Sequence, residues 1–521
     1  MASNNTRSRS RVELSMGHLW AITVMAGVFA FVNTHPIRPH DFWWHLKAGE
    51  LIASTGRIPT VDTFSFLAAG RPYPYTSYWL METLLYRLYA LGKAPLVVLA
   101  TSLSITAAYA CILWASRLRS GSWRIAAACT LAAAALGIDN WNVRPQSMVI
   151  LCFAAIQLAL TAYEQRHRWV WLAVPPLAML IWVNSHGSYP LGWVLLGFWL
   201  LESLWQRRRD GTLSWQALRA PALTLTASIL AVLANPQGIR ALVYPSAILT
   251  DPAVRSLVTE WAPTSSATMS GKLFLAALFG TAALLIAAPK RPSLITALML
   301  LGFAMLALSS HRHILWFGLV AAVESASLLA TLAARSYPSR NSQLARREHP
   351  ALNAAIALGL LAAAILSLPW LKAMLPLPPQ KAGIISSETP VALAEAMQAA
   401  RWPQPIFNDE TFGSYLIWAA SPEVQVFVDP RIDLYSMSEW MDYLAIASAR
   451  YDWERILDRY GIATLVLSVD RQPALIAAAA ASPSWTRVYE DELAVVYSRQ
   501  PQASLALPRA HSLPFRRMLY G

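Results

Sequence analysis

Apolar stretches of nearly membrane-spanning length fill most of the first two thirds of this chain. We count about 11 of them, each close to the roughly 20 residues that a helix needs to cross the hydrocarbon core of a bilayer. Hydrophobic residues make up 56% of the 521 residues and charged residues only 14%, a balance that exceeds what a soluble core needs. The sequence therefore predicts an all-α polytopic membrane domain, with spans near 18–33, 95–115, 125–137, 147–163, 169–183, 191–205, 223–233, 273–288, 293–308, 314–333 and 352–370.

Basic clusters between the apolar stretches predict the orientation of the chain. Arginines precede the first span, and every second connection after it is basic, at 117–124, 166–168, 207–209, 290–291 and 335–347. The positive-inside rule places these connections and the N-terminus in the cytoplasm. The alternation holds only if the segment 78–91 lies at the membrane interface without crossing it. The net charge of +13 then reflects membrane topology, and we expect no nucleic-acid partner.

The composition changes to a mixed polar and apolar chain after Pro376. Strand-like runs occur at 424–428, 463–467 and 493–497, and alternate with polar connections. We therefore divide the chain into a multi-spanning domain, 1–375, with a long first outer loop at about 35–93, and a small α/β domain, 376–521, on the extracytoplasmic surface. We expect a multi-pass protein of the bacterial plasma (inner) membrane.

The connections predicted to lie outside carry a different set of side chains from the arginine-rich cytoplasmic ones. They combine carboxylates, histidines, amides and arginines at one membrane depth, which favours an outward-facing site. The three cysteines fall inside predicted spans and are typical of small packing residues rather than ligands or disulfide partners. The outer set comprises Asp41, His45, Glu50, Asp62, Glu82, Asn142, Arg144, Asn184, His186, Asn235, Gln237, Arg240, His311, Arg312 and His313.

The first outer loop carries the sharpest local signal. Asp41 stands where a helix N-cap would, Gly56 stands where a C-terminal glycine would, and the aromatic residues 42–44 suit the headgroup zone. On one interpretation, Asp41 only caps this interfacial helix. On the other, Asp41 and His45 lie four residues apart on one helical face, so that a carboxylate and an imidazole share one small volume suited to proton abstraction.

This loop resembles the first loop of the GT-C glycosyltransferases, multi-spanning enzymes that take sugars from polyprenyl-phosphate donors on the outer face of the membrane. The resemblance is to bacterial relatives of the protein mannosyltransferases and covers roughly the first 90 residues. Its residues are Asp41 soon after the first span, the segment 56–65 (GRIPTVDTFS), and Tyr78-Trp79-Leu80-Met81-Glu82. It implies a GT-C-like membrane domain, inverting sugar transfer, and Asp41 as general base.

An inverting transfer needs a base, support for an oxocarbenium-like centre, and cations for the leaving phosphate. The resemblance implies that Asp62 and Glu82 hold sugar hydroxyls or buttress the first loop. Asp62 could equally be a turn carboxylate, and Glu82 could face water at an interfacial helix. His45 would bind substrate beside the base.

Arginines and histidines at the outer span ends are the candidates for binding phosphate. Arginine gives a forked, permanently charged contact, although arginines at span ends also reach toward lipid headgroups for purely structural reasons. His311 and His313 could instead bind a divalent metal, but their spacing points them apart, so we expect no metal and no cofactor to be required. His186 could orient a phosphate or an acceptor, or be an interfacial histidine. The phosphate candidates are Arg144, His186, Arg240, His311, Arg312 and His313.

The expected partners are a polyprenyl-phosphate-linked sugar donor, a glycan, lipid or protein acceptor, and membrane lipid. In the outer domain, Phe407-Asn408-Asp409-Glu410, a turn at Gly413-Ser414-Tyr415 and the segment 428–433 resemble acceptor-binding loops, with Asp429 and Asp433 shaping a turn. A lipid-linked glycan transporter or binding protein remains an alternative. It would be expected to show paired repeats and polar mid-membrane helices, which the sequence lacks.

Overall fold

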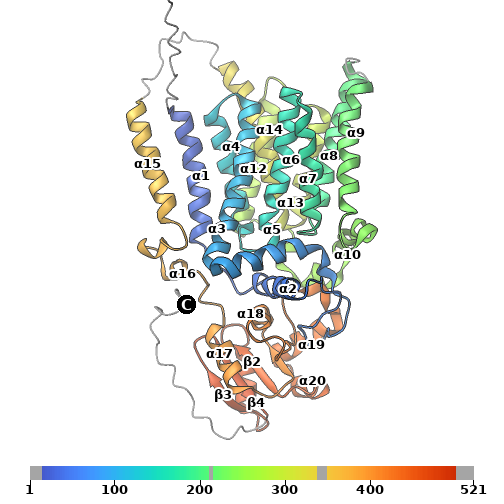
Figure 1. Ribbon diagram of the computed structural model, residues 1–521, viewed down its shortest axis with the longest axis vertical. Coiled ribbons are helices and arrows are strands. Elements are labelled where there is room, and N and C mark those ends of the chain that lie inside the picture. Colours follow the sequence, from blue (N-terminus) through green and yellow to red (C-terminus); the bar gives the residue numbers. More distant parts are fainter. Residues whose placement is uncertain (1–13, 211–214, 337–348, 500–521) are drawn as a thin grey trace, which may run out of the picture.

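The computed structural model describes residues 14–210, 215–336 and 349–499. The arginines predicted to precede the first span and most of the basic segment 335–347 lie outside these residues. Figure 1 shows a tall bundle of helices with a small domain at one end, which contains the strands. The two parts meet through α2, Phe42–Thr55, and α18, Glu410–Ala420.

Each predicted span overlaps a helix of the bundle. By length and composition, five helical segments among the described residues could cross a membrane, and four more apolar helices are shorter. This agrees with the predicted all-α membrane domain, while the number of crossings stays a prediction. The helices are α1 (Met16–Thr34), α3 (Trp79–Ser120), α4 (Trp123–Gly137), α6 (Ile150–Arg166), α7 (Val174–Val183), α8 (Pro190–Asp210), α9 (Trp215–Val232), α12 (Met269–Ala287), α13 (Leu294–Ser309), α14 (Ile314–Ser336) and α15 (Pro350–Leu366).

The long helix α3 has two parts. Its backbone leaves helical geometry at Gly92 and Lys93, where Lys93 has φ 54°, and Pro95 opens the second part. Figure 1 shows the first part lying across the end of the bundle, near α2, and the second part running along the bundle. The break therefore separates the segment 78–91 from the span that follows it, as an interfacial segment requires.

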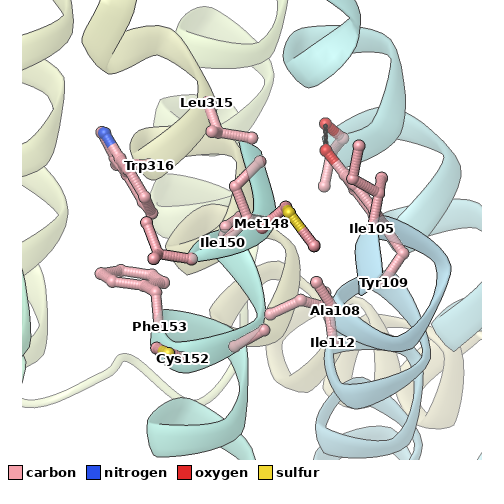
Figure 2. Packing of buried hydrophobic residues seen from close by; sticks show 14 of the residues in the cluster. Ile105, Ala108, Tyr109, Ile112, Met148, Ile150, Cys152, Phe153, Leu315 and Trp316 are labelled. Atoms are coloured by element: carbon pink, nitrogen blue, oxygen red, sulfur yellow. Dashed lines mark hydrogen bonds between the residues drawn. The ribbon is translucent and has the colours of Figure 1, made fainter. Parts of the chain in front are cut away.

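The bundle core is built where α3, α6 and α14 meet. Most buried apolar residues of these helices belong to one cluster, and Tyr109 and Phe153 are fully enclosed in it. Close packing of this kind fixes the relative heights of the helices, and therefore the positions of their outer ends. Figure 2 shows part of the cluster, with labels on Ile105, Ala108, Tyr109, Ile112, Met148, Ile150, Cys152, Phe153, Leu315 and Trp316.

Several connections at the end of the bundle that faces the small domain contain short helical segments. They carry Arg240 and the triplet His311, Arg312 and His313, and Arg144 directly precedes α5. These segments are η1 (Pro74–Tyr78), η2 (Ile138–Asn140), α5 (Pro145–Met148), η4 (Gly238–Leu242), α10 (Tyr244–Thr250), α11 (Pro252–Leu257), η5 (Thr259–Trp261) and η6 (His311–His313).

The C-terminal domain, which we call the outer domain after its predicted location, contains a four-stranded sheet with the order β1-β2-β4-β3. β1 pairs in parallel with β2, and the other two pairs are antiparallel. The sheet is covered by helices, which agrees with the predicted α/β class. Its elements are α17 (Val391–Ala400), β1 (Ile406–Asn408), α18, α19 (Met437–Ala447), α20 (Trp453–Arg459), β2 (Thr464–Ser468), α21 (Pro473–Ala481), β3 (Thr486–Glu490) and β4 (Ala494–Ser498).

Two of the three predicted strands are confirmed as β2 and β4, and the third is wrong. The segment 424–428 lies outside the sheet because its backbone bonds elsewhere. The Asn408 side chain accepts from Phe427 N–H at 2.7 Å and donates to the Val428 carbonyl at 2.9 Å, and Val426 pairs with the first outer loop at Ser65. The expected turn at 413–415 is also wrong, since these residues lie inside α18.

Candidate functional site

Asp41 occupies the N-cap position of α2, as predicted, but does not cap the helix. Its backbone is helical, and its side chain makes no capping hydrogen bond. The predicted C-terminal glycine is confirmed, because Gly56 adopts the left-handed conformation with φ 66° and ends the helix. The Asp41 carboxylate is 30% exposed and lies 3.4 Å from the Arg144 guanidinium. The structure therefore does not support the interpretation in which Asp41 only caps the helix.

Arg144 joins Asp41 to a second carboxylate. Pro145 restricts Arg144 to the extended conformation observed, and α5 begins directly after it. The other end of the same guanidinium lies 3.0 Å from the Glu260 carboxylate. Arg144 Nε is buried and has no hydrogen-bond partner within the described ranges. One arginine thus connects residues that are far apart in the sequence and keeps one donor unused.

Glu260 is a site residue that the sequence analysis missed. It lies in η5, whose backbone is fixed to the outer ends of α13 and η6: the Ser310 hydroxyl donates to the Glu260 carbonyl at 3.0 Å, and His311 N–H donates to Ala262 at 3.0 Å. Burial alone would raise the pKa of Glu260. The charges of Arg144 and Arg312 outweigh burial and hold this pKa below its ordinary value. Glu260 is therefore ionised at neutral pH.

Arg312 also lies near Glu260. Its guanidinium donates to Gln146 at 2.7 Å and lies over the Trp261 ring, 4.8 Å from the ring centroid. These contacts hold the cation without neutralising it, because an amide and an aromatic face carry no net charge. Arg144 and Arg312 both act electrostatically on Glu260, so these two arginines lie near the same carboxylate.

The two histidines beside Arg312 have different surroundings. His311 Nε2 lies 3.2 Å from the Asp139 carboxylate, so this imidazole has an acidic partner. The His313 ring packs edge-on against Trp261, with 6.1 Å between the ring centroids. Within residues 14–210, 215–336 and 349–499, no group of three or more His, Cys, Asp or Glu side chains could hold a metal ion. Metal independence stays a prediction.

His45 does not pair with Asp41 as the spacing had indicated. Its imidazole is bonded to the Glu82 carboxylate at 2.9 Å, and both side chains are buried. The expectation that Glu82 could face water is therefore wrong, because this residue is 1% exposed. Burial, followed by the charges of His186, Arg431 and Arg144, lowers the pKa of His45 well below its ordinary value. His45 is accordingly a neutral hydrogen-bonding group.

Aromatic rings surround this histidine–glutamate pair. The His45 ring lies against Trp44, with 3.5 Å between centroids, and edge-on to Tyr78 at 5.5 Å. The His186 ring stacks on Tyr78, with 5.3 Å between the ring centroids, and burial lowers the pKa of His186 as well. His45 and Glu82 therefore form a buried link between α2 and the first part of α3, and the partly exposed His186 joins it through Tyr78.

Asp62 has a structural position. One carboxylate oxygen accepts from the Ser65 hydroxyl at 2.6 Å, and the other is paired with Arg431 of the outer domain. Arg431 also forms a forked contact with Asp429, at 2.7 Å through Nε and through Nη2. All three charged side chains are fully enclosed. Of the two roles that the resemblance left open, the structure favours buttressing of the first loop.

Arg240 does not join the other arginines. Its side chain is exposed, and in the part of the chain that the structure describes no hydrogen bond or ion pair connects it to Asp41, Arg144 or Arg312. The polar residues before it have structural roles. Asn235 donates to the Val183 carbonyl at 2.8 Å, and Gln237 donates to the Thr76 hydroxyl at 2.8 Å.

The outer domain contacts the start of α2. The Trp44 N–H of α2 donates to the Ser414 hydroxyl of α18 at 3.1 Å. Glu410 lies at the start of the same helix, next to Asp409, which binds Arg471 at 2.7 Å. Burial raises the pKa of Glu410 to about 7, and the negative charges of Asp409, Asp41 and Asp429 contribute further. Asp41 and Glu410 of the outer domain are therefore close enough to interact electrostatically.

No family model matches this chain, and no curated protein sequence matches it. Among solved structures, the chain is similar to the archaeal oligosaccharyltransferase AglB from Archaeoglobus fulgidus in complex with an inhibitory peptide and a dolichol-phosphate. The TM-score is 0.55 at 11% identity, over 93% of this chain and 74% of that one.

The chain is also similar to ArnT from Cupriavidus metallidurans. The structure bound to undecaprenyl phosphate gives a TM-score of 0.50 at 14% identity, and the apo structure gives 0.50 at 16% identity. Each match covers 93% of this chain and 98% of ArnT, so the likeness extends over both the bundle and the outer domain. The chain therefore has the fold of the GT-C membrane glycosyltransferases.

Proposed function

We propose that this protein is a glycosyltransferase that moves a sugar from a polyprenyl-phosphate donor to an acceptor on the extracytoplasmic face of the membrane, with inversion. The observation that carries the proposal is the Asp41 carboxylate, which makes no capping hydrogen bond and lies 3.4 Å from the Arg144 guanidinium at the outer end of the bundle. A partly exposed carboxylate can accept a proton, and permanently charged arginines beside it can bind phosphate. The fold likeness to proteins solved with dolichol-phosphate and undecaprenyl phosphate supports this choice of donor.

The reaction follows from these groups. Asp41 takes the proton of the acceptor nucleophile as that atom forms a bond to the anomeric carbon of the sugar. The bond from this carbon to the phosphate oxygen breaks, and its electron pair leaves with the phosphate. Arg144 and Arg312 stabilise the negative charge that develops on the leaving group. Direct displacement in one step inverts the anomeric centre.

Transfer by purified protein in nanodiscs tests the proposal. A panel of polyprenyl-phosphate sugars would be presented with candidate glycan, lipid and peptide acceptors, and the product would be followed by mass spectrometry. A donor that binds tightly but is never transferred with any acceptor would instead indicate a lipid-linked glycan binding protein or transporter.

Removing the arginines should weaken the use of the donor. We expect Arg144→Ala and Arg312→Ala each to raise the donor KM by roughly tenfold or more, because each removes a charge-assisted contact to phosphate. Arg57→Ala is the matched control, since Arg57 is an exposed arginine at the end of α2 and should leave the donor KM unchanged. Unchanged donor dependence in both Arg144→Ala and Arg312→Ala would remove the phosphate assignment.

We also propose that the protein lies in the bacterial plasma membrane with its N-terminus in the cytoplasm and its outer domain outside. Single cysteines at Tyr451, which is 98% exposed in the outer domain, and at the exposed Arg168 would be labelled in a background lacking Cys111, Cys129 and Cys152. Intact cells should label Tyr451→Cys only, and permeabilised cells should label both. The reverse pattern would mean that the orientation is inverted.

A further inference from the structure

The first turn of α2 is capped by another domain. The N–H groups at the start of a helix have no partners within the helix, and an N-cap aspartate usually accepts from one of them. Here Asp41 makes no such bond. Ser414 provides the acceptor instead, because its hydroxyl oxygen receives the Trp44 N–H at 3.1 Å. Trp44 is the third residue of α2, a position whose N–H an N-cap side chain commonly binds.

Ser414 is held in place by close packing of α18. The residue is fully buried. Its neighbour Gly413 is so close to the segment behind it that a Cβ at this position would lie 2.5 Å from the Val428 carbonyl oxygen. Its other neighbour, Tyr415, packs edge-on against Trp43, with 4.8 Å between the ring centroids. The acceptor hydroxyl therefore has little freedom to move away from α2.

α2 is equally restricted on its other side. A Cβ at Gly49 would lie 2.1 Å from the Glu82 carbonyl oxygen, so α2 crosses the first part of α3 in direct backbone contact. The His45–Glu82 bond joins the same two helices. α2 is thus held between α3 and α18, and the Asp41 carboxylate lies beside Arg144 without bonding an N–H of the helix.

We propose that Ser414 is a positioning residue for Asp41: by capping α2 from the outer domain, it leaves the Asp41 carboxylate free to lie beside Arg144. This inference rests on the proposed function. Without the Ser414 hydroxyl, the Trp44 N–H would lack a partner, and the Asp41 carboxylate at the N-cap position is an acceptor in the same turn. Aspartate is among the preferred N-cap residues, and its contact with Arg144 is partly exposed to solvent. The carboxylate would therefore turn back to cap its own helix.

The kinetic test is Ser414→Ala. We expect kcat to fall by roughly tenfold or more with the donor KM little changed, because the base is misplaced while the arginines remain. Ser414→Thr keeps a hydroxyl and should recover part of the loss. Ser436→Ala is the matched control: Ser436 caps α19 in the same domain, accepting from Glu439 N–H at 3.3 Å. The Ser436→Ala variant should have a lower unfolding temperature and an unchanged kcat.

A double-mutant cycle separates this inference from the proposed function. If Ser414 acts through Asp41, Ser414→Ala should cause no further loss of turnover in the Asp41→Asn background. An equal loss in both backgrounds, or normal kcat in Ser414→Ala, would overturn the positioning role. Normal turnover by Asp41→Asn alone would instead overturn the base assignment.

Hydrogen exchange tests the cap without measuring activity. Because Asp41 is expected to replace Ser414 as the cap, the amides at the start of α2 should exchange fastest in the Ser414→Ala/Asp41→Ala double variant, beyond either single variant. Exchange in Ser414→Ala as fast as in the double variant would show that Asp41 does not turn back, and would overturn the inference.

Discussion

Asp41→Asn should reduce sugar transfer by roughly 10²-fold or more while leaving the protein folded, because asparagine cannot take a proton from the acceptor. The side chain keeps its size. Asparagine also caps helices about as well as aspartate, so no loss of α2 is expected. The structure strengthens this prediction, since Asp41 makes no capping bond and the change removes charge rather than a cap. Turnover would be measured in nanodiscs, alongside thermal unfolding of the same samples.

Asp251→Asn provides the matched control for this change. Asp251 also lies at an outer helix end, and its carboxylate accepts from Val254 N–H at 2.9 Å as a true N-cap of α11. Asparagine should preserve both this cap and activity. Near-normal turnover by a well-folded Asp41→Asn variant would move the search for the base to Glu260, the other carboxylate that contacts Arg144. Asp62 and Glu82 are buried and already paired.

The helical bundle could be predicted from the sequence because its two signals, apolar stretches and basic connections, are local and recur along the chain. Apolar length identifies a span, and the alternation of basic connections adds a constraint that every span must satisfy. That alternation required the segment 78–91 to lie apart from the span that follows it, and α3 breaks at Gly92 and Lys93. The strands β2 and β4 were also local signals, since both are continuous apolar runs that are buried throughout.

The site was predictable only in part, because its contacts join distant segments. Position relative to the spans indicated Asp41, Arg144 and Arg312, since residues at span ends lie at one depth. Glu260 gave no comparable signal: it lies in a short helical turn in the long connection between α9 and α12. The only indication of a role for Glu260 is that it is an acidic residue in a connection predicted to lie outside the membrane. Its role depends on the two arginines that it meets in the fold.

His45 shows how helical spacing can indicate the wrong partner. Residues four apart share a helical face, which placed His45 near Asp41. Spacing along one helix does not reveal which other helix covers that face. Here the first part of α3 covers it and supplies Glu82, while Asp41 at the helix end turns toward Arg144. The segment 424–428 failed for a related reason, because the Asn408 side chain takes the backbone bonds that a strand neighbour would have made.

The largest expected loss of stability is for Arg431→Ala. Arg431 is fully buried between Asp62 of the first loop and Asp429 of the outer domain. The charges of these two aspartates outweigh the effect of burial and hold the pKa of Arg431 well above its ordinary value. Removing the arginine leaves two enclosed carboxylates without a cation, which should cost about 3–5 kcal/mol of unfolding free energy. Thermal and denaturant unfolding of the outer domain, followed by tryptophan fluorescence, would measure it.

Arg71→Ala is the matched control, because Arg71 joins the same two parts of the chain through Glu439 but is 41% exposed. An ion pair that is open to water should contribute only about 0–1 kcal/mol to the unfolding free energy. If buried charge balance is what holds the first loop on the outer domain, the two variants should differ by several kcal/mol, and Arg431→Ala should also lower activity by loosening the loop that carries Asp41. Equal and small losses in both variants would show that the apolar packing around this cluster, rather than its ion pairs, fixes the loop.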